Sequence, residues 1–290
     1  HTTHIPMPAF VTDVGAFVVD TAAFARLDLC ATDAGEASIE VWSNVLALDL
    51  YGGDSVRQAQ ARMVDALGRP SPLPSWGLAP WVDAIFGSDA VRATAARLRE
   101  EQIPASALWS EDWRGGTMVG PEVYRLDEDW RADPVLYPDL AQLTAEVGAL
   151  GFKEMVYFNT FVTEGGDVFE EITAAGHAIK TPAGEPLLFT GADADFSPTA
   201  LVDLTNADAR AYLMGHLKGA LDAGVRGWMA DFGEWMPVDG AALASGEDPA
   251  LVHNRYPVLW QQANREALEE AGVQDDAIVF VRSGHIGSQA

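Results

Sequence analysis

Acidic and polar side chains follow five apolar, strand-like runs of the chain, at the point where each run ends. Asp231 and Glu234 follow the fourth run, and Arg282 and His285 follow the fifth. The earlier runs are followed by Asp83, by Glu111, Asp112 and Trp113, and by Asn159. In a parallel α/β fold these positions meet at one edge of the sheet, where such folds place their chemistry. Carboxylates there can accept hydrogen bonds from sugar hydroxyls, or serve as nucleophile and acid in glycosidic cleavage.

Five tryptophans lie near the same positions in the sequence. They are Trp81, Trp109, Trp113, Trp228 and Trp235. Aromatic faces stack on the apolar faces of sugars, so carboxylates and tryptophans together indicate a carbohydrate site. Acidic strand ends also build magnesium sites, and tryptophan more often packs in a core, so these residue types alone leave both alternatives open.

The elements that must position these residues alternate between strand and helix. Strand-like runs cover residues 77–82, 107–109, 155–158, 227–231 and 277–281, and helical periodicity covers 88–98, 139–150, 206–223 and 251–271. This pattern predicts an α/β fold with a parallel sheet and five βα units. A closed (β/α)8 barrel needs eight units, so the pattern leaves open an open sheet or part of a barrel. The long connections 111–136 and 160–206 are expected to form walls of an active site.

The first 70 residues have a different pattern. Residues 16–19, 37–42 and 45–51 are predicted to be short strands, and Asp54 and Ser55 are predicted to cap a helix that Gly68 ends. Three prolines then occur within residues 69–75, which indicates a stiff, extended connector. We therefore predict two domains, residues 1–70 and 71–290.

Composition excludes several classes of partner. The 290 residues contain 18 basic and 43 acidic side chains, a formal net charge of −25, which argues against binding nucleic acid or an anionic membrane. Cys30 is the one cysteine, so no internal disulfide or cysteine-based zinc cluster is expected, and we predict no cofactor or metal. No apolar run approaches the roughly 20 residues of a membrane span. We expect a small carbohydrate ligand and a cytoplasmic protein, with oligomerisation left open; the start at His1, without a leader, suggests that residues precede it.

Residues 227–235, Gly-Trp-Met-Ala-Asp-Phe-Gly-Glu-Trp, closely resemble the nucleophile motif of glycoside hydrolase family 31, in the form found in its sulfoquinovosidase-like branch. Four further segments resemble motifs of that branch in the same order: residues 109–113, 201–206, 253–260 and 282–289. The resemblance runs from about residue 78 to the end of the chain. It implies that residues 71–290 are roughly the first five βα units of a (β/α)8 barrel, and that residues 1–70 are the end of a β-sandwich domain.

The resemblance also implies an activity, that of a retaining α-glycosidase working through a covalent glycosyl-aspartate. Asp231 would be the nucleophile, Glu234 a supporting residue, and Arg282 a partner of Asp231 that also contacts the sugar. From the strand-end positions and the resemblance together, we expect the substrate-binding residues to be Asp83, Glu111, Asp112, Trp113, Arg125, Trp228, Arg282 and His285. The family's general acid is an aspartate beyond the last of these motifs, so we expect it to follow Ala290 and the present chain alone to be inactive.

Two departures from the branch leave the substrate open. Glu111 replaces a glutamine, and Glu128 replaces the tryptophan that follows the anion-binding arginine, here Arg125, by three residues. With Asp127 and Asp129, these charges would oppose a sulfonate, so a neutral α-glucoside-type hexoside and a sulfoquinovoside both stay candidates. A non-catalytic carbohydrate-binding member of the family is the alternative function. A metal-dependent hydrolase on an open α/β sheet would need His/Asp ligand clusters that the sequence does not show.

Overall fold

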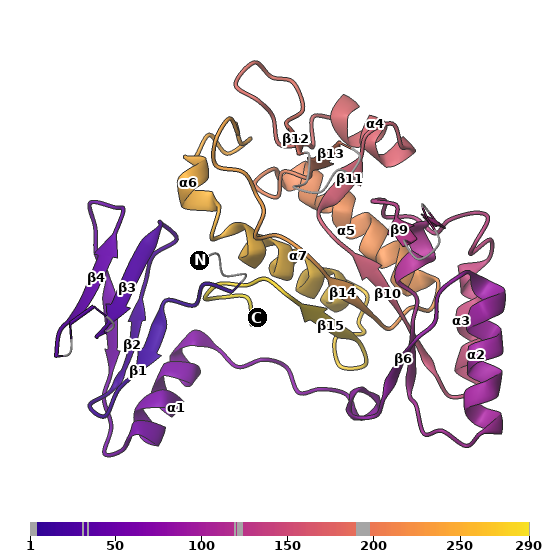
Figure 1. The fold of residues 1–290 in the computed structure, drawn as a ribbon, viewed down its shortest axis with the longest axis horizontal. Coiled ribbons are helices and arrows are strands. Elements are labelled where there is room, and N and C mark those ends of the chain that lie inside the picture. The colour runs from indigo at the N-terminus through magenta and orange to yellow at the C-terminus, as the bar shows by residue number, and fades with distance from the viewer. Residues whose placement is uncertain are drawn as a thin grey trace.

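The computed structural model describes residues 5–30, 32–33, 35–118, 120, 124–189 and 198–289. Figure 1 shows an N-terminal group of strands with helix α1 on one side of the molecule, and a larger α/β body on the other. An extended connector that contains Pro70, Pro72 and Pro74 joins them along one edge. Among the described residues, no helix is both long and apolar enough to cross a bilayer.

The N-terminal part contains two small antiparallel sheets. Strands β1 (Ala9–Val11), β2 (Ala16–Val19) and β5 (Leu48–Tyr51) form one, and β3 (Ala25–Leu29) pairs with β4 (Ala37–Val41) in the other. Helix α1 (Val56–Leu67) begins where the Ser55 side chain accepts the Gln58 N–H and ends at Gly68, as predicted. Strands β1 and β3 were not predicted; β1 has only three residues, whereas β3 alternates apolar and polar residues and could have been recognised from the sequence.

The α/β body is built on a five-stranded parallel sheet with the order β15-β14-β10-β7-β6. Its strands are β6 (Trp81–Asp83), β7 (Ala107–Trp109), β10 (Lys153–Phe158), β14 (Gly227–Ala230) and β15 (Ile278–Val281). Each of these strands pairs with the strand of the same sheet that precedes or follows it along the chain, so the order of the strands in space is their order in the sequence. This arrangement confirms the predicted parallel sheet and differs from a doubly wound fold, whose strand order reverses at a switch point.

The sheet is strongly curved. In a flat sheet β6 and β15 would lie about 19 Å apart, four strand spacings of about 4.8 Å. The Trp81 ring of β6 and the Phe280 ring of β15 nevertheless have centroids 5.5 Å apart, and Trp109 of β7 lies 5.7 Å from the same phenylalanine. Side chains of the two edge strands therefore meet across the concave face, as in part of a barrel.

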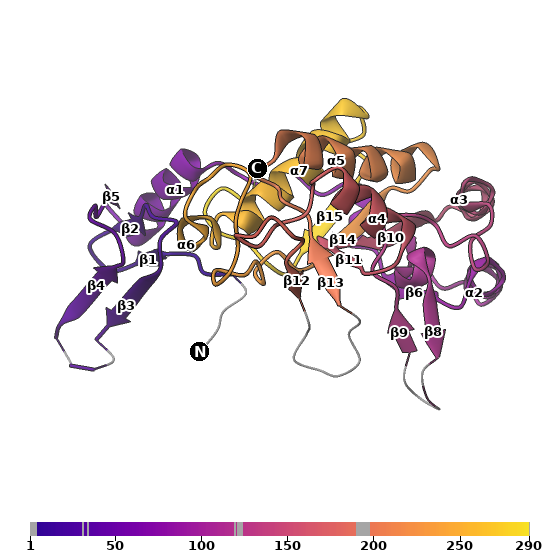
Figure 2. The same cartoon turned by 90° about the horizontal axis from the view of Figure 1, so that it is seen from above.

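Amphipathic helices cover the convex face. The long ones are α2 (Ser88–Glu100), α3 (Leu140–Ala149), α5 (Ala207–Asp222) and α7 (Tyr256–Glu270). Figures 1 and 2 show α5 beside α7 and α2 beside α3. The helix predicted over 251–271 is divided into α6 (Pro249–Val252) and α7, because Pro257 lacks the N–H that would continue the helix and favours its first turn instead.

The long connections at the carboxyl ends of the strands contain structure of their own. The first holds the 3-10 turn η2 (Glu111–Arg114) and the hairpin of β8 (Gly116–Met118) and β9 (Tyr124–Leu126). The second holds β11 (Phe161–Thr163), α4 (Asp167–Ala174), β12 (Leu188–Phe189) and β13 (Thr199–Leu201). Hairpin β8–β9 and strands β12 and β13 project on the same side of the molecule (Figure 2). The predicted strand over 77–82 is instead the turn η1 (Ser75–Leu78) followed by β6, because Pro80 interrupts it.

Candidate active site

The concave face carries two layers of side chains. Paired residues of a parallel sheet share a face, so the register places Trp109, Met155 and Ile278 together, one step below Tyr157, Met229 and Phe280. The next residues on this face along β14 and β15 are Asp231 and Arg282. The apolar layer thus forms a floor, and the candidate catalytic groups lie above it at the carboxyl ends of the strands.

Asp231 follows β14 directly and is 5% exposed. Its N–H donates to the carbonyl of Phe158 at 2.8 Å, and its carbonyl accepts from the Trp260 indole at 3.2 Å, so the backbone is fixed on both sides. In the side chain, Oδ1 lies 3.1 Å from Arg282 Nε, and Oδ2 accepts the hydroxyl proton of Tyr157. The carboxylate is therefore held between a cation and a neutral donor.

Arg282 bridges Asp231 and Glu234. Its Nε donates to Glu234 Oε1 at 3.0 Å, and Nη2 lies 2.8 Å from the same oxygen. The guanidinium also lies 3.9 Å from the centroid of the Phe232 ring and 5.4 Å from that of Trp235, both within cation–π range. Arg282 is held by a carboxylate on one side and an aromatic surface on the other, which fixes its charge beside Asp231.

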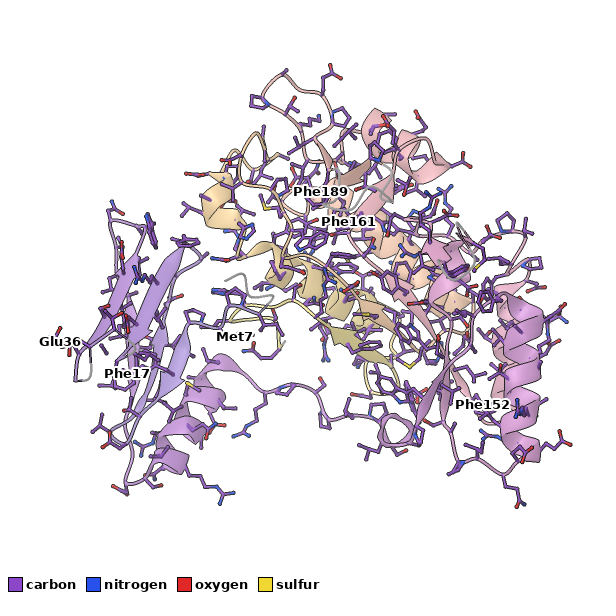
Figure 3. The ribbon with its side chains drawn as sticks, viewed as in Figure 1. Met7, Phe17, Glu36, Phe152, Phe161 and Phe189 are labelled. Atoms are coloured by element: carbon purple, nitrogen blue, oxygen red, sulfur yellow. The ribbon has the colours of Figure 1, made fainter. Side chains whose placement is uncertain are left out.

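The loop after Asp231 turns sharply, and an aromatic cluster supports it. Phe232 has a left-handed backbone (φ 56°), and Gly233 follows at φ 108°, where a Cβ would lie 2.9 Å from Ser283 Oγ. Four rings pack there: Phe161, Phe189, Phe232 and Trp235, with the first two labelled in Figure 3. Ser283 Oγ donates to the Phe232 carbonyl. This packing maintains the strained turn, a feature often found at functional sites.

A buried polar network lies behind Tyr157. The Arg114 guanidinium lies 4.3 Å from the centroid of the Tyr157 ring and forms an ion pair with Glu128, whose carboxylate also accepts from Asn159 Nδ2. The side chains of Arg114 and Glu128 are 1% and 9% exposed. Burial raises the pKa of the Tyr157 phenol well above its usual value, against the opposing effect of Arg114. Tyr157 therefore stays protonated, and its O–H group donates a hydrogen bond to Asp231.

Glu128 does not have the surroundings that the sequence suggested. We expected its charge beside Arg125, where it would oppose an anionic ligand. The structure corrects this prediction, because Glu128 turns inward and Arg114 compensates its charge. Arg125 lies on the exposed side of β9; burial raises the pKa of the neighbouring Asp127, and the positive charge of Arg125 acts in the opposite direction. Asp129 accepts the backbone N–H groups of the two residues that follow it.

Asp83 and Glu111 are acidic residues at the carboxyl ends of the neighbouring strands β6 and β7. Burial and the neighbouring charge of Asp112 raise the pKa of Asp83. The pKa of Glu111 is also raised, first by burial and then by the charge of Asp83, with Arg114 acting in the opposite direction. The charge of Asp231 raises the pKa of Glu111 as well, so Glu111 lies within electrostatic reach of both Asp83 and Asp231. These carboxylates can accept hydrogen bonds from ligand hydroxyls.

Asp112 is fully buried, and three groups of the chain donate to its carboxylate. The donors are the Phe86 N–H at 2.8 Å, the Tyr124 hydroxyl at 2.9 Å and the Tyr137 hydroxyl. Phe86 is exposed, has a left-handed backbone (φ 75°) and packs against the Tyr124 ring. Asp112 thus fixes the loop after β6 and the hairpin after β7; that it binds a sugar directly stays a prediction.

The side chains of three other predicted substrate contacts are buried and pack inward. Trp113 and Trp228 are almost completely buried, and their indole N–H groups donate to the Tyr157 carbonyl and to Asn264 Oδ1, both at 2.7 Å. His285 is buried; burial lowers its pKa, against the smaller opposing effects of the Ile286 backbone and of the charge of Asp20 in the N-terminal part. Sequence position near a strand end did not distinguish these inward-packed side chains from ones that face a ligand.

Sequence reasoning missed Tyr157, Arg114 and Phe86. Tyr157 could have been found, because alternation along β10 places it on the same face as Asn159, next to the strand that ends at Asp231. Arg114 lies in η2, whose position depends on tertiary packing. In the described parts of the chain, no group of three or more His, Cys, Asp or Glu side chains could hold a metal ion.

Comparison with known proteins gives a consistent result. Residues 70–290 match the family described as "Glycosyl hydrolases family 31 TIM-barrel domain". The chain is 32% identical to a sulfoquinovosidase of Agrobacterium fabrum, over 100% of this chain and 43% of that protein, and 24% identical to an alpha-xylosidase of Emericella nidulans, over 91% and 33%.

Among solved structures, it is similar to a GH31 family sulfoquinovosidase from E. rectale in complex with the aza-sugar inhibitor IFGSQ. The TM-score is 0.90 at 29% identity, covering 99% of this chain and 43% of that one. The chain thus spans about two fifths of the length of the sulfoquinovosidases it matches.

Proposed function

The chain belongs to glycoside hydrolase family 31, and from this membership and the surroundings of Asp231 we propose that the gene product that carries it is a retaining α-glycosidase. The observation that carries the proposal is the Asp231 carboxylate at the carboxyl end of β14, held between Arg282 and Tyr157. A nucleophile needs a charged carboxylate in a fixed orientation, and a neighbouring cation favours the charged form.

The proposed reaction proceeds through a glycosyl ester of Asp231. The carboxylate attacks the anomeric carbon, the glycosidic bond breaks, and the leaving oxygen takes a proton from a second carboxyl group; water then hydrolyses the ester. Glu234 is poorly placed to give that proton, because Oε1 lies against both Nε and Nη2 of Arg282. We assign Glu234 to positioning Arg282 and propose that the proton comes from another carboxyl group.

For the substrate we place a neutral α-hexoside of the glucoside type first. The supporting observation is the two acidic residues Asp83 and Glu111 at the carboxyl ends of β6 and β7, where Glu111 lies within electrostatic reach of both Asp83 and Asp231. Negative charge there disfavours an anionic sugar and accepts hydrogen bonds from neutral hydroxyls. A sulfoquinovoside is the second candidate, which the similarity to two sulfoquinovosidases favours.

Covalent labelling tests the nucleophile. The full-length gene product should be inactivated by a fluorinated α-glycosyl fluoride, and mass spectrometry should find the sugar on the peptide that contains Asp231. The Asp231→Ala variant should neither turn over an aryl α-glycoside nor take up the label. A label on Glu234 or Asp203 would overturn the assignment. Sugar binding without labelling or turnover would favour the alternative, a non-catalytic carbohydrate-binding protein.

A comparison of kcat/KM on an aryl α-glucoside and an aryl α-sulfoquinovoside tests the substrate class. We expect less than about 100-fold preference for the sulfonated sugar, which corresponds to about 2.7 kcal/mol. Glu111→Gln removes one charge, worth about 1 kcal/mol at a partly shielded distance of several ångströms, and should shift the ratio about five- to tenfold toward the sulfonated substrate. Glu100→Gln, at an exposed position on α2, is the matched control and should leave the ratio unchanged.

A further inference from the structure

We infer that Tyr157 is a positioning residue that acts mainly in the second half of the reaction, when water hydrolyses the glycosyl ester and Asp231 leaves as a carboxylate. The inference rests on the proposed function, because it requires Asp231 to be the nucleophile. It starts from one contact, the hydrogen bond from the Tyr157 hydroxyl to Asp231 Oδ2.

The orientation of Tyr157 is fixed from several sides. The Arg114 guanidinium covers its ring at 4.3 Å, and Arg114 is itself held by Glu128, which Asn159 also contacts. The Tyr157 carbonyl accepts the Trp113 indole N–H at 2.7 Å. Tyr157 is 6% exposed, so a rotated hydroxyl would need another partner in a buried region. The O–H group therefore stays directed at Asp231 without reorganisation during the reaction.

The two supports of Asp231 differ in character. Arg282 Nε lies 3.1 Å from Oδ1, but its N–H group donates a hydrogen bond to Glu234, so Arg282 acts on Asp231 as a nearby positive charge. Oδ1 has no hydrogen-bond partner among the described residues. The Tyr157 hydroxyl is then the one hydrogen-bond donor that the described part of the chain directs at this carboxylate. Its contribution depends on how much charge the carboxylate carries.

That charge changes in opposite directions in the two steps. When the ester forms, Asp231 loses its negative charge and the hydrogen bond from Tyr157 weakens. When water adds to the anomeric carbon, the bond between that carbon and the aspartyl oxygen breaks, the electron pair returns to Asp231 and the proton of the water goes to the catalytic base. A hydrogen bond to a charged acceptor is about twice as strong as a hydrogen bond to a neutral acceptor. In both oxocarbenium-like transition states the aspartyl oxygen carries most of its negative charge. Tyr157 should thus stabilise the first transition state about as much as the charged carboxylate that precedes it, but the second transition state more than the neutral ester. It therefore lowers the barrier of the second step and leaves that of the first nearly unaffected.

The test measures the two steps separately in the full-length protein. Wild type and Tyr157→Phe are labelled with a fluorinated α-glycosyl fluoride, the excess reagent is removed, and the return of activity is followed. The ester should decay about 10- to 100-fold more slowly in Tyr157→Phe, the range expected for loss of a charge-assisted hydrogen bond. The rate at which the label forms should change less than about threefold. With an activated aryl glycoside, kcat and KM should fall together.

Tyr212→Phe is the matched control. Tyr212, on α5, also donates its hydroxyl proton to a carboxylate, that of Glu171, outside the group around Asp231. It should keep the wild-type rates of ester formation and decay. A ring-fluorinated tyrosine at position 157 is a stronger donor of the same shape, and it should accelerate decay of the ester even if Tyr157→Phe were poorly folded.

The outcomes separate this inference from the proposed function. If wild type takes no label on Asp231, the proposed function fails. If wild type is labelled on Asp231 but the ester of Tyr157→Phe decays at the wild-type rate, the role of Tyr157 is wrong. Equal slowing of label formation and decay would also overturn the inference, because it would indicate a general loss of structure around Asp231.

Discussion

We expect the free energy of unfolding of this protein to fall as pH rises, because the buried Glu154 then loses its proton. It lies in β10 on the helix-covered face of the sheet and is 2% exposed. The Ser110 hydroxyl contacts the Ala84 carbonyl at 2.9 Å and Glu154 Oε1 at 2.7 Å. A hydroxyl has one proton and a carbonyl can only accept, so both contacts are satisfied when Glu154 carries a proton and donates it to Ser110. Burial raises the pKa of Glu154 to about 8, and the charge of Asp112 adds to the effect.

The sign and size of the pH dependence follow from this raised pKa. An unfolded glutamate loses its proton near pH 4.5, whereas folded Glu154 keeps it until about pH 8. Between these values the folded state binds the extra proton, so this contribution to stability is complete below pH 4.5 and is lost as pH rises through 8. The free energy of unfolding should fall by about 1.4 kcal/mol per pH unit in that window.

Glu154→Gln removes the titration while keeping the donor, because the amide N–H can replace the carboxylic O–H toward Ser110. Urea unfolding of the full-length protein at pH 5, 6, 7 and 8 should show the variant gaining on wild type at every step. It should be several kcal/mol more stable than wild type at pH 8. Glu100→Gln, on the exposed side of α2, serves as the control and should show no such trend. A difference between Glu154→Gln and wild type that does not change with pH would refute the reasoning.

Two further substitutions test the geometry around Asp231. Gly233→Ala should destabilise the protein by about 1–3 kcal/mol and reduce turnover, because φ is 108° and the new Cβ would meet Ser283 Oγ at 2.9 Å. The control is Gly240→Ala, at φ 73° in open space, which should cost less stability and leave turnover unchanged. Thermal unfolding and an aryl-glycoside assay measure the two effects. Asp112→Asn should lower the free energy of unfolding by about 1–3 kcal/mol, because the amide nitrogen that replaces one carboxylate oxygen cannot accept, so at least one of the three donors loses its acceptor. Unchanged stability with a raised KM would instead support direct sugar binding by Asp112.

The charges around the site bear on the substrate in a way that the sequence suggested only in part. Glu128 replaces a tryptophan of the related branch, and its charge alone seemed to oppose a sulfonate. In the structure this charge is compensated by Arg114, so the argument for a neutral sugar now depends on Asp83 and Glu111. Removal of Glu111's charge is therefore the informative substitution, and a change at Glu128 would mainly unpair a buried arginine.

The sequence by itself determined the order and type of the main elements and the identity of the candidate nucleophile. Buried parallel strands are continuous apolar runs, and Asn206, Asp139 and Ser55 are recognisable helix caps, so these elements depend on local residue pattern. The segment around Asp231 was recognisable because the chemistry requires particular residues next to one another in the chain. Fold class and candidate nucleophile could thus be predicted without coordinates.

Only the tertiary structure decided which of the candidate residues meet. Trp228 and Asp231 are three residues apart, yet the first packs under α7 and the second faces the concave side, because alternation along a strand sends neighbours to opposite faces. The contact of Tyr157 with Asp231 joins two residues that are 74 positions apart in the sequence, and the pairing of Arg114 with Glu128 joins η2 to the segment after β9. Such contacts depend on the curvature and register of the whole sheet, which no local pattern in the sequence specifies.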